Sequence, residues 1–100
     1  MAAIFAALGD ETRLTIFSRL GDGSTQSISQ LAEGLPLTRQ GVTRHLRVLE
    51  DARLVQSRRI GRETRYTLDV KAVRHANRYL ARASEQWDQA ISRLSRHLQD

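Results

Sequence analysis

The sequence predicts a mainly helical domain with one small β-hairpin, in the order α-α-α-α-β-β-α. Apolar residues recur at helical spacing through most of the chain, but after Ala52 they alternate with polar residues, which is typical of strands. Gly61 and Arg62 divide the alternating stretch as a two-residue hairpin turn would. A chain of 100 residues suffices for one domain with one modest core, so we assign residues 1–100 to a single domain.

Three short helices are expected in the first third of the chain. Residues 2–8 form the first, and Asp10 is an expected N-cap of the second. The expected apolar stripe of the second helix consists of Leu14, Phe17 and Leu20, with Ile16 beside it. Ser27 and Gln30 have the spacing of a capping box, which predicts that the third helix begins there.

A fourth helix is expected over residues 39–52, with Thr38 as its N-cap. Its apolar back is formed by Val42, Leu46 and Leu49. Its front carries long side chains that form hydrogen bonds: Arg39, Gln40, Thr43, Arg44 and Arg47. His45 lies at the edge of the apolar stripe, where a packing role or a position near a ligand of this face is expected rather than metal binding.

Residues 54–68 form the expected hairpin, which carries four arginines: Arg58, Arg59, Arg62 and Arg65. A last helix is expected over residues 70–98, after Asp69 as its N-cap. Its apolar stripe consists of Val73, Ala76, Leu80, Ala83, Trp87, Ile91, Leu94 and Leu98. Such a helix would be about 40 Å long, whereas a domain of this size has a radius of gyration of about 13 Å. The stripe therefore exceeds what the helix can bury against its own domain.

Composition and charge exclude several classes of protein. Cys is absent, which excludes disulfides, thiolate metal sites and Cys nucleophiles. No apolar run approaches the roughly 18 residues of a membrane span, and the N-terminus lacks the positive start of a signal peptide, so a cytoplasmic protein is expected. The net charge is +5, and residues 36–68 hold eight Arg against three acids. This distribution indicates a surface that binds a polyanion, although an Arg-rich solvated face is the alternative.

A short helix followed by a helix with a polar front is the order of a helix-turn-helix, in which the second helix enters the major groove of DNA. Gln pairs with adenine and Arg with guanine there, and Thr contacts a base or a thymine methyl. An Arg-rich hairpin directly afterwards is suited to flanking phosphates or to the minor groove.

Two stretches carry a family resemblance. ALGDETRLTIFSRL is similar to the opening helix motif of ArsR-type (ArsR/SmtB) repressors, and LTRQGVTRHLRVLEDARLVQSRRIGRETRYTL resembles their recognition helix and wing. The resemblance covers roughly residues 3–68, and the last helix matches in position and character. It implies a winged helix-turn-helix fold, a homodimer built from the first and last helices, and a repressor that binds an inverted-repeat operator until a signal releases it. Arg13, within the first motif, is expected to form a structural ion pair.

Carried over by position, the resemblance assigns the DNA contacts to Arg39, Gln40, Thr43, Arg44, Arg47, Arg58, Arg59, Arg62, Arg65 and Ser27. It assigns the dimer interface to Ile4, Phe5, Leu8, Leu80, Trp87, Ile91 and Leu94. Gly41 is unusual inside a helix, where it costs about 1 kcal/mol relative to Ala, and close approach to DNA or no role at all are both open.

The chain departs from the metal-sensing members of this family. Their Cys-x-Cys pair is missing, and Asp69, His75 and His97 lack the spacing of the second known site. We therefore expect no metal and no cofactor, and the inducing ligand or partner is unknown. Trp87 could line a ligand pocket instead of the dimer interface.

The residues disfavour two further classes of function. A protein-interaction module on the same scaffold is disfavoured by the basic front of the fourth helix. An enzyme is disfavoured because the sequence holds no Gly-rich phosphate loop, no Cys and no ordered Ser, His and acid set.

Overall fold

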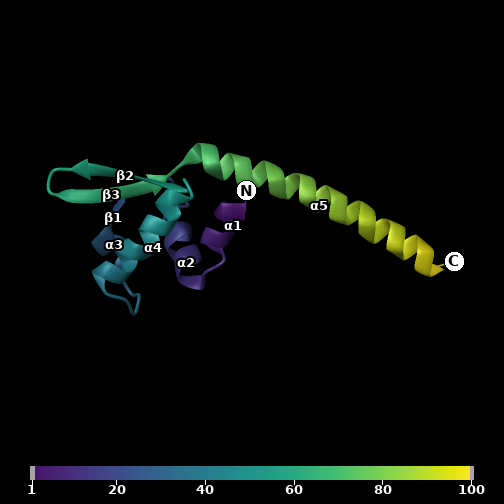
Figure 1. Ribbon diagram of the computed structural model, residues 1–100, viewed down its shortest axis with the longest axis horizontal. Helices are drawn as coiled ribbons and strands as arrows, with labels where there is room; N and C mark the ends of the chain where they lie inside the picture. The colour runs from purple at the N-terminus through teal and green to yellow at the C-terminus, as the bar shows by residue number, and fades with distance from the viewer. Residues whose placement is uncertain (1, 100) are drawn as a thin grey trace.

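The computed structural model describes residues 2–99 and has the predicted order of elements (Figure 1). The helices are α1 (Ala2–Leu8), α2 (Glu11–Arg19), α3 (Ile28–Ala32), α4 (Arg39–Asp51) and α5 (Val70–Gln99). The strands are β1 (Gln26–Ser27), β2 (Val55–Ile60) and β3 (Glu63–Leu68). The prediction of a mainly helical winged helix-turn-helix fold is confirmed.

The sheet contains a strand that the sequence did not predict. Its order is β1-β3-β2 and both pairings are antiparallel. β1 consists of two residues, Gln26 opposite Tyr66 and Ser27 opposite Arg65. Two residues are too few to show an alternating pattern, so β1 could not be recognised from periodicity. Because β1 pairs with β3, the start of α3 is attached to the hairpin.

The core lies between α1 to α4 and the inner face of the sheet. Its largest side chains with less than 2% exposure are Ile16, Leu20, Leu31, Leu46, Leu49, Leu54, Val42 and Val55. The predicted stripe of α4 is thus confirmed. In the second helix the predicted stripe is confirmed for Leu20, which is fully buried, and for Phe17, which packs against the core. The prediction of Leu14 was wrong, because Leu14 is 47% exposed and Ile16 is fully buried in its place. Side chains two positions apart in a helix point in directions that differ by about 200°, so a helix that buries Ile16 exposes Leu14.

Three of the four predicted N-caps are present, those of α2, α3 and α4. At the fourth, the carboxylate of Asp69 accepts a hydrogen bond from the backbone N–H of Lys71 at 3.1 Å. The carboxylate of Asp10 accepts a hydrogen bond from the backbone N–H of Arg13 at 2.9 Å. The hydroxyl of Thr38 accepts one from Gly41 N–H at 3.0 Å. Ser27 and Gln30 form the reciprocal capping box. Each cap satisfies donors that the first turn of a helix would otherwise leave without partners, and so fixes where the helix begins.

Arg13 forms hydrogen bonds to backbone carbonyls of α1 instead of the expected ion pair. Its Nε donates to the backbone carbonyl of Ala7 at 2.6 Å, and an Nη donates to that of Ala6 at 3.4 Å. These carbonyls lie at the end of α1, where the last turn lacks intrahelical donors and carries the negative end of the helix dipole. Arg13 therefore caps α1 and attaches it to α2.

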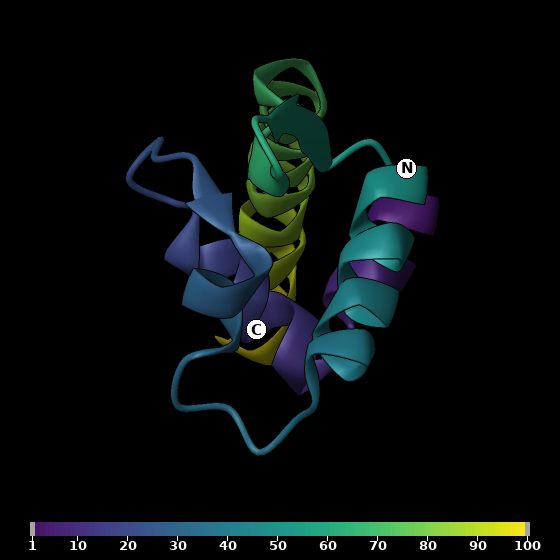
Figure 2. The same cartoon turned by 90° about the vertical axis from the view of Figure 1, so that its left-hand side faces the viewer.

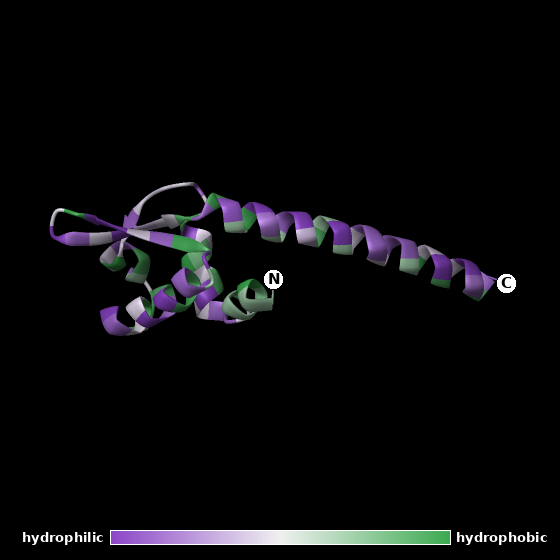
Figure 3. Ribbon diagram, turned by 45° about the horizontal axis from the view of Figure 1, so that its top comes forward, coloured by the Kyte–Doolittle hydropathy of each residue, from purple (hydrophilic) through white to green (hydrophobic). Residues whose placement is uncertain are grey.

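α5 extends far beyond the remainder of the chain (Figure 1). Residues 2–99 measure 66 × 28 × 21 Å along their principal axes. Seen from the end where the hairpin lies, α3 and α4 lie on opposite sides of the view and α5 recedes behind them (Figure 2). Within α5, Ala76 is buried against the core, while apolar segments recur along the helix to its end (Figure 3).

Candidate nucleic-acid interface

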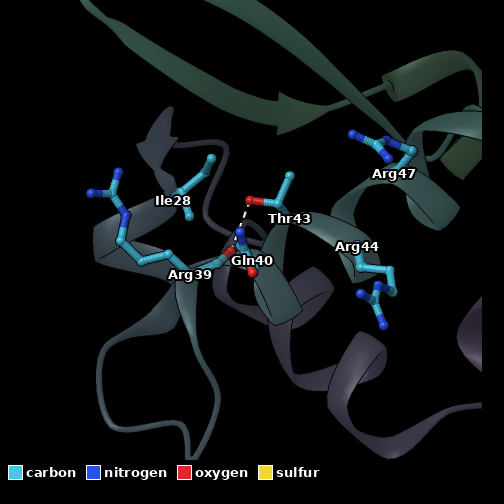
Figure 4. A pocket seen from close by; sticks show the side chains of 6 residues that line it. All are labelled: Ile28, Arg39, Gln40, Thr43, Arg44 and Arg47. Carbon is cyan, nitrogen blue, oxygen red and sulfur yellow. Dashed lines mark hydrogen bonds between the residues drawn. The ribbon is translucent and has the colours of Figure 1, made fainter.

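The five residues that the sequence assigns to the front of α4 lie around one surface hollow of about 400 Å³ (Figure 4). We call it the reading hollow, and it is lined by Ile28, Arg39, Gln40, Thr43, Arg44 and Arg47. Ile28 comes from α3, and the other five belong to the first three turns of α4. The hollow therefore brings the guanidinium groups of three arginines together with the amide of Gln40 and the methyl group of Thr43. These are groups that read base edges in the major groove.

The back of α4 holds this face in place. Val42, Leu46 and Leu49 are fully buried, so the helix cannot turn about its axis without exposing them. On the front, the hydroxyl of Thr43 donates to the carbonyl oxygen of Arg39 at 2.8 Å (Figure 4). Because this bond uses the hydroxyl proton, Thr43 offers its methyl group and the lone pairs of its oxygen to a ligand.

The side of α4 toward α2 carries His45. Its Nδ1 lies 3.9 Å from a carboxylate oxygen of Asp10, the N-cap of α2. The backbone N–H of Arg13 lowers the pKa of Asp10 below its ordinary value, and the charges of Arg13 and His45 act in the same direction. His45 thus lies between two helices, where it contributes to packing.

Tyr66 belongs to β3 and is buried, with 6% exposure. Burial raises the pKa of its phenol, and the carboxylate of Glu50 adds to that effect, whereas Arg47 opposes it. The phenol is therefore neutral under physiological conditions. The carboxylate of Glu50 accepts a hydrogen bond from the hydroxyl of Ser57 at 2.6 Å, which joins the end of α4 to β2.

The four arginines of the hairpin do not share one face. Arg58 lies opposite Arg65 in the β2–β3 register, whereas the neighbouring residue Arg59 lies opposite Thr64. Successive residues of a strand point to opposite faces, so Arg59 is on the face of Tyr66 and Arg58 is on the other. Arg62 is in the turn. All four arginines were expected to contact DNA as one group, whereas the alternation of side chains along the two strands separates Arg59 from Arg58 and Arg65.

Ser27 combines a capping role with the position that the sequence assigned to it. It is 7% exposed, and its hydroxyl oxygen accepts the N–H of Gln30 at 3.2 Å as the cap of α3. This bond does not use the hydroxyl proton, and Ser27 lines a surface hollow together with Arg39, Arg59 and Arg62. Ser27 therefore stays an expected DNA contact. Ile28, Ser29 and Thr64 also line surface hollows beside the expected contacts, and no sequence signal marks them.

The residues expected at a dimer interface fall into two groups. Ile4 is 8% exposed and belongs to the core of its own chain, and the ring of Phe5 lies 5.6 Å from that of Tyr79. Leu8 is half-buried against the same core. The residues of α5 are open instead: Leu80 is 52% exposed, Trp87 70%, Ile91 59% and Leu94 62%.

Two further findings concern the part of the chain that the structure describes. Across residues 2–99, no three His, Asp or Glu side chains converge on a point that could hold a metal ion. None of the helices in that range is both long and apolar enough to cross a bilayer.

Comparison with known proteins gives consistent results. A family model described as a helix-turn-helix domain matches residues 8–58. The uncharacterised HTH-type transcriptional regulator YuzN of Bacillus subtilis is 42% identical over 60% of this chain and 72% of its own length. A transcriptional repressor SmtB homolog of Synechocystis is 35% identical over 81% of this chain. The aligned part spans 61% of that relative, which is therefore the longer protein.

Among solved structures, an ArsR-like transcriptional regulator from Rhodococcus sp. RHA1 has a TM-score of 0.74 and 40% sequence identity. The match covers 93% of this chain and 87% of that one.

Proposed function

Since the chain belongs to the ArsR/SmtB family of helix-turn-helix transcriptional regulators, we propose that it is a homodimeric repressor that binds an inverted-repeat operator in double-stranded DNA. The observation that carries this proposal is the reading hollow. It gathers Arg39, Gln40, Thr43, Arg44 and Arg47 on the exposed front of a helix whose back is fully buried. We infer a location in the cytoplasm from this DNA partner.

The uncovered face of α5 supports the dimer. Ala76 packs on the core, and at helical spacing the same face continues outward through Leu80, Trp87, Ile91 and Leu94. These four side chains are all more than half exposed. A contiguous apolar surface of this kind marks a site of association. A second copy of α5 has the same surface, as a two-fold symmetric interface requires.

The sequence of α5 further favours an antiparallel arrangement. The apolar positions are symmetric about the peptide bond between Ala83 and Ser84: Leu80 mirrors Trp87, and Val73 mirrors Leu94. A two-fold axis at this bond would therefore place Leu80 of each protomer beside Trp87 of its partner. The apolar stripe would then face its own copy along the length of the contact.

A symmetric dimer has a direct consequence for the DNA. Two copies of α4 related by a two-fold axis read two copies of the same half-site in inverted order, and the half-sites lie about 34–36 Å or a multiple of this apart.

The alternative, a protein-interaction module, would require a partner for the front of α4. That front is basic and polar instead of apolar, so it fits a polyanion better than the core of a protein interface. An enzymatic role is not proposed, because the family is one of transcriptional regulators.

A titration of labelled duplex DNA tests the proposal. The duplex is taken from the region upstream of the chain's own gene, and a scrambled duplex of the same composition serves as control. Binding is followed by fluorescence anisotropy at about 50 and 200 mM salt, the range over which phosphate contacts lose most of their strength. We expect at least tenfold tighter binding to the native duplex at both salts. Equal binding to both duplexes would contradict sequence-specific recognition of this region, and no binding at low salt would contradict DNA binding altogether.

A further inference from the structure

A second hollow of about 230 Å³ lies beside the reading hollow, and its lining divides the arginines of the hairpin. We call it the wing hollow. Its polar lining consists of Ser27 and Ser29 at the start of α3, Arg39 of α4, and Arg59, Arg62, Glu63 and Thr64 of the hairpin. Arg58 and Arg65 are not among its lining residues. Arg39 lines both hollows, so a ligand that occupies one can continue into the other.

The wing hollow is electropositive. Three guanidinium groups face one carboxylate, that of Glu63, and this carboxylate is already paired with Arg65 at 3.1 Å. Arg59 is held in place because its Nε donates to the carbonyl oxygen of Gly61 in the turn at 3.3 Å. The remaining guanidinium donors of Arg39, Arg59 and Arg62 are suited to a phosphate, which accepts several charge-assisted hydrogen bonds at once.

The other face of the hairpin differs in its electrostatics. Arg58 and Arg65 lie directly opposite each other in the register, an arrangement in which like charges repel. Glu63 offsets this through its bonds to Arg65. Arg65 is therefore committed to an ion pair within the hairpin, and Arg58 lies on the face turned away from the wing hollow.

We propose that the wing hollow holds the DNA phosphodiester that links the major-groove contact of α4 to the groove beside the hairpin. In this assignment Arg39, Arg59 and Arg62 bind the backbone, whereas Arg58 and Arg65 do not. The inference rests on the proposed DNA binding and goes beyond it, because it divides an apparently uniform set of wing arginines into two functions. It also explains why Arg59 is tethered to its own turn, since a tethered side chain loses less entropy when it binds a phosphate.

The neighbouring residues Arg58 and Arg59 provide the test, because Arg58→Ala and Arg59→Ala remove the same charge from the same strand but from opposite faces. Affinity of the full chain for a random-sequence duplex is measured by anisotropy over a salt series. For Arg59→Ala we expect affinity to fall by about three- to tenfold at low salt and the salt slope to decrease by about 0.9, the value for one phosphate. For Arg58→Ala we expect affinity within about twofold of wild type and an unchanged slope.

Two more variants complete the design. Arg62 lies in the exposed turn and does not depend on the hydrogen bond between Arg59 and Gly61. Arg62→Ala should therefore lower the affinity and the salt slope as Arg59→Ala does. Arg59→Lys retains the charge and should recover the slope with part of the affinity. Equal losses for Arg58→Ala and Arg59→Ala would overturn the wing hollow as a phosphate site while leaving DNA binding intact. If the wild-type chain does not bind duplex at low salt, the proposed function itself fails.

Discussion

The Nε of Arg13 donates a hydrogen bond of 2.6 Å to the carbonyl oxygen of Ala7, across the boundary between the first two helices. α1 has seven residues, which is too short for a helix to be stable by itself in water. Its position depends on packing through Ile4 and Ala7, both buried, and on this bond to its last turn. Because α1 lies beside the start of α5 through the contact between Phe5 and Tyr79, the bond also shapes the surface on which a second copy would pack.

Arg13→Ala should lower the free energy of unfolding by about 1.5–3 kcal/mol, the range for a hydrogen bond from a charged donor. The loss arises because the carbonyl oxygens at the end of α1 lose their donor and the negative end of the dipole loses its cation. Urea unfolding followed by circular dichroism measures it. Arg62→Ala, in the exposed turn of the hairpin, serves as control and should stay within about 0.5 kcal/mol of wild type. Equal stability of both variants would contradict a capping role for Arg13.

Asp10 predicts an acid-dependent loss of stability. The pKa of Asp10 is lowered in the folded chain, so its charged form stabilises the fold above the unfolded-state pKa of about 3.9. This contribution is lost as pH falls through the folded pKa. Asp10→Asn retains an N-cap but does not titrate. The midpoint of thermal unfolding of wild type should therefore decline more than that of the variant between pH 5 and strongly acidic pH, with Asp51→Asn as control. Parallel declines of wild type and Asp10→Asn would refute this.

Gly41 is a site where the chain can be stabilised. A Cβ added there would lie 3.4 Å from the hydroxyl oxygen of Thr38 and 3.7 Å from the Cβ of Leu37, which are ordinary contact distances. Gly41→Ala should raise the free energy of unfolding by about 0.5–1 kcal/mol through helix propensity. Gly41 is not among the residues that line the reading hollow, so affinity for DNA should change by less than about twofold. Stability is measured in urea and affinity by anisotropy, and a large loss of affinity with a stable fold would show that Gly41 faces the DNA.

The apolar face of α5 predicts which substitutions weaken the dimer. Trp87 lies on that face, whereas Arg82 is two positions beyond Leu80 and therefore on the opposite side of the helix. Trp87→Glu should weaken dimerisation by at least about tenfold in sedimentation equilibrium, because a charge would replace an apolar side chain in the contact. Arg82→Glu is the matched control and should dimerise within about twofold of wild type.

The two variants separate association through the apolar face from a general effect of added negative charge on α5. Equal weakening of dimerisation by Trp87→Glu and Arg82→Glu would contradict association through this face. A wild-type chain that is monomeric at micromolar concentration would exclude the dimer itself.

Arg44 should distinguish base reading from phosphate binding. It lies in the reading hollow on the exposed front of α4. Arg44→Ala should weaken binding to the operator by about 1–3 kcal/mol, the range for a bidentate contact with a base. Its affinity for random duplex should change little. Arg74→Ala removes the same charge from the exposed surface of α5 and serves as control, so its affinities for operator and for random duplex should both change little. Equal losses of Arg44→Ala on operator and random duplex would assign Arg44 to the phosphates instead.

The sequence by itself determined the order of the five helices and the hairpin, and the N-caps of α2, α3 and α4. Capping and helix periodicity are local, because a Ser, Thr or Asp side chain reaches an N–H only two or three residues away. For the same reason the buried back and polar front of α4 could be read from spacing, and so could the excess length of α5. The five residues of α4 that line the reading hollow could be predicted in this way, since they all lie on one helix.

Only the tertiary structure decided which surfaces these residues share. It rotated α2 so that Ile16 is buried and Leu14 exposed, because a nine-residue helix with apolar residues on several sides is oriented by its neighbours. It engaged Ser27 in a buried cap and brought Ser29 beside Arg59, which is thirty positions away in the chain. Contacts of this kind depend on the packing of whole elements against a common core, and that packing leaves no periodic signal in the residues that meet.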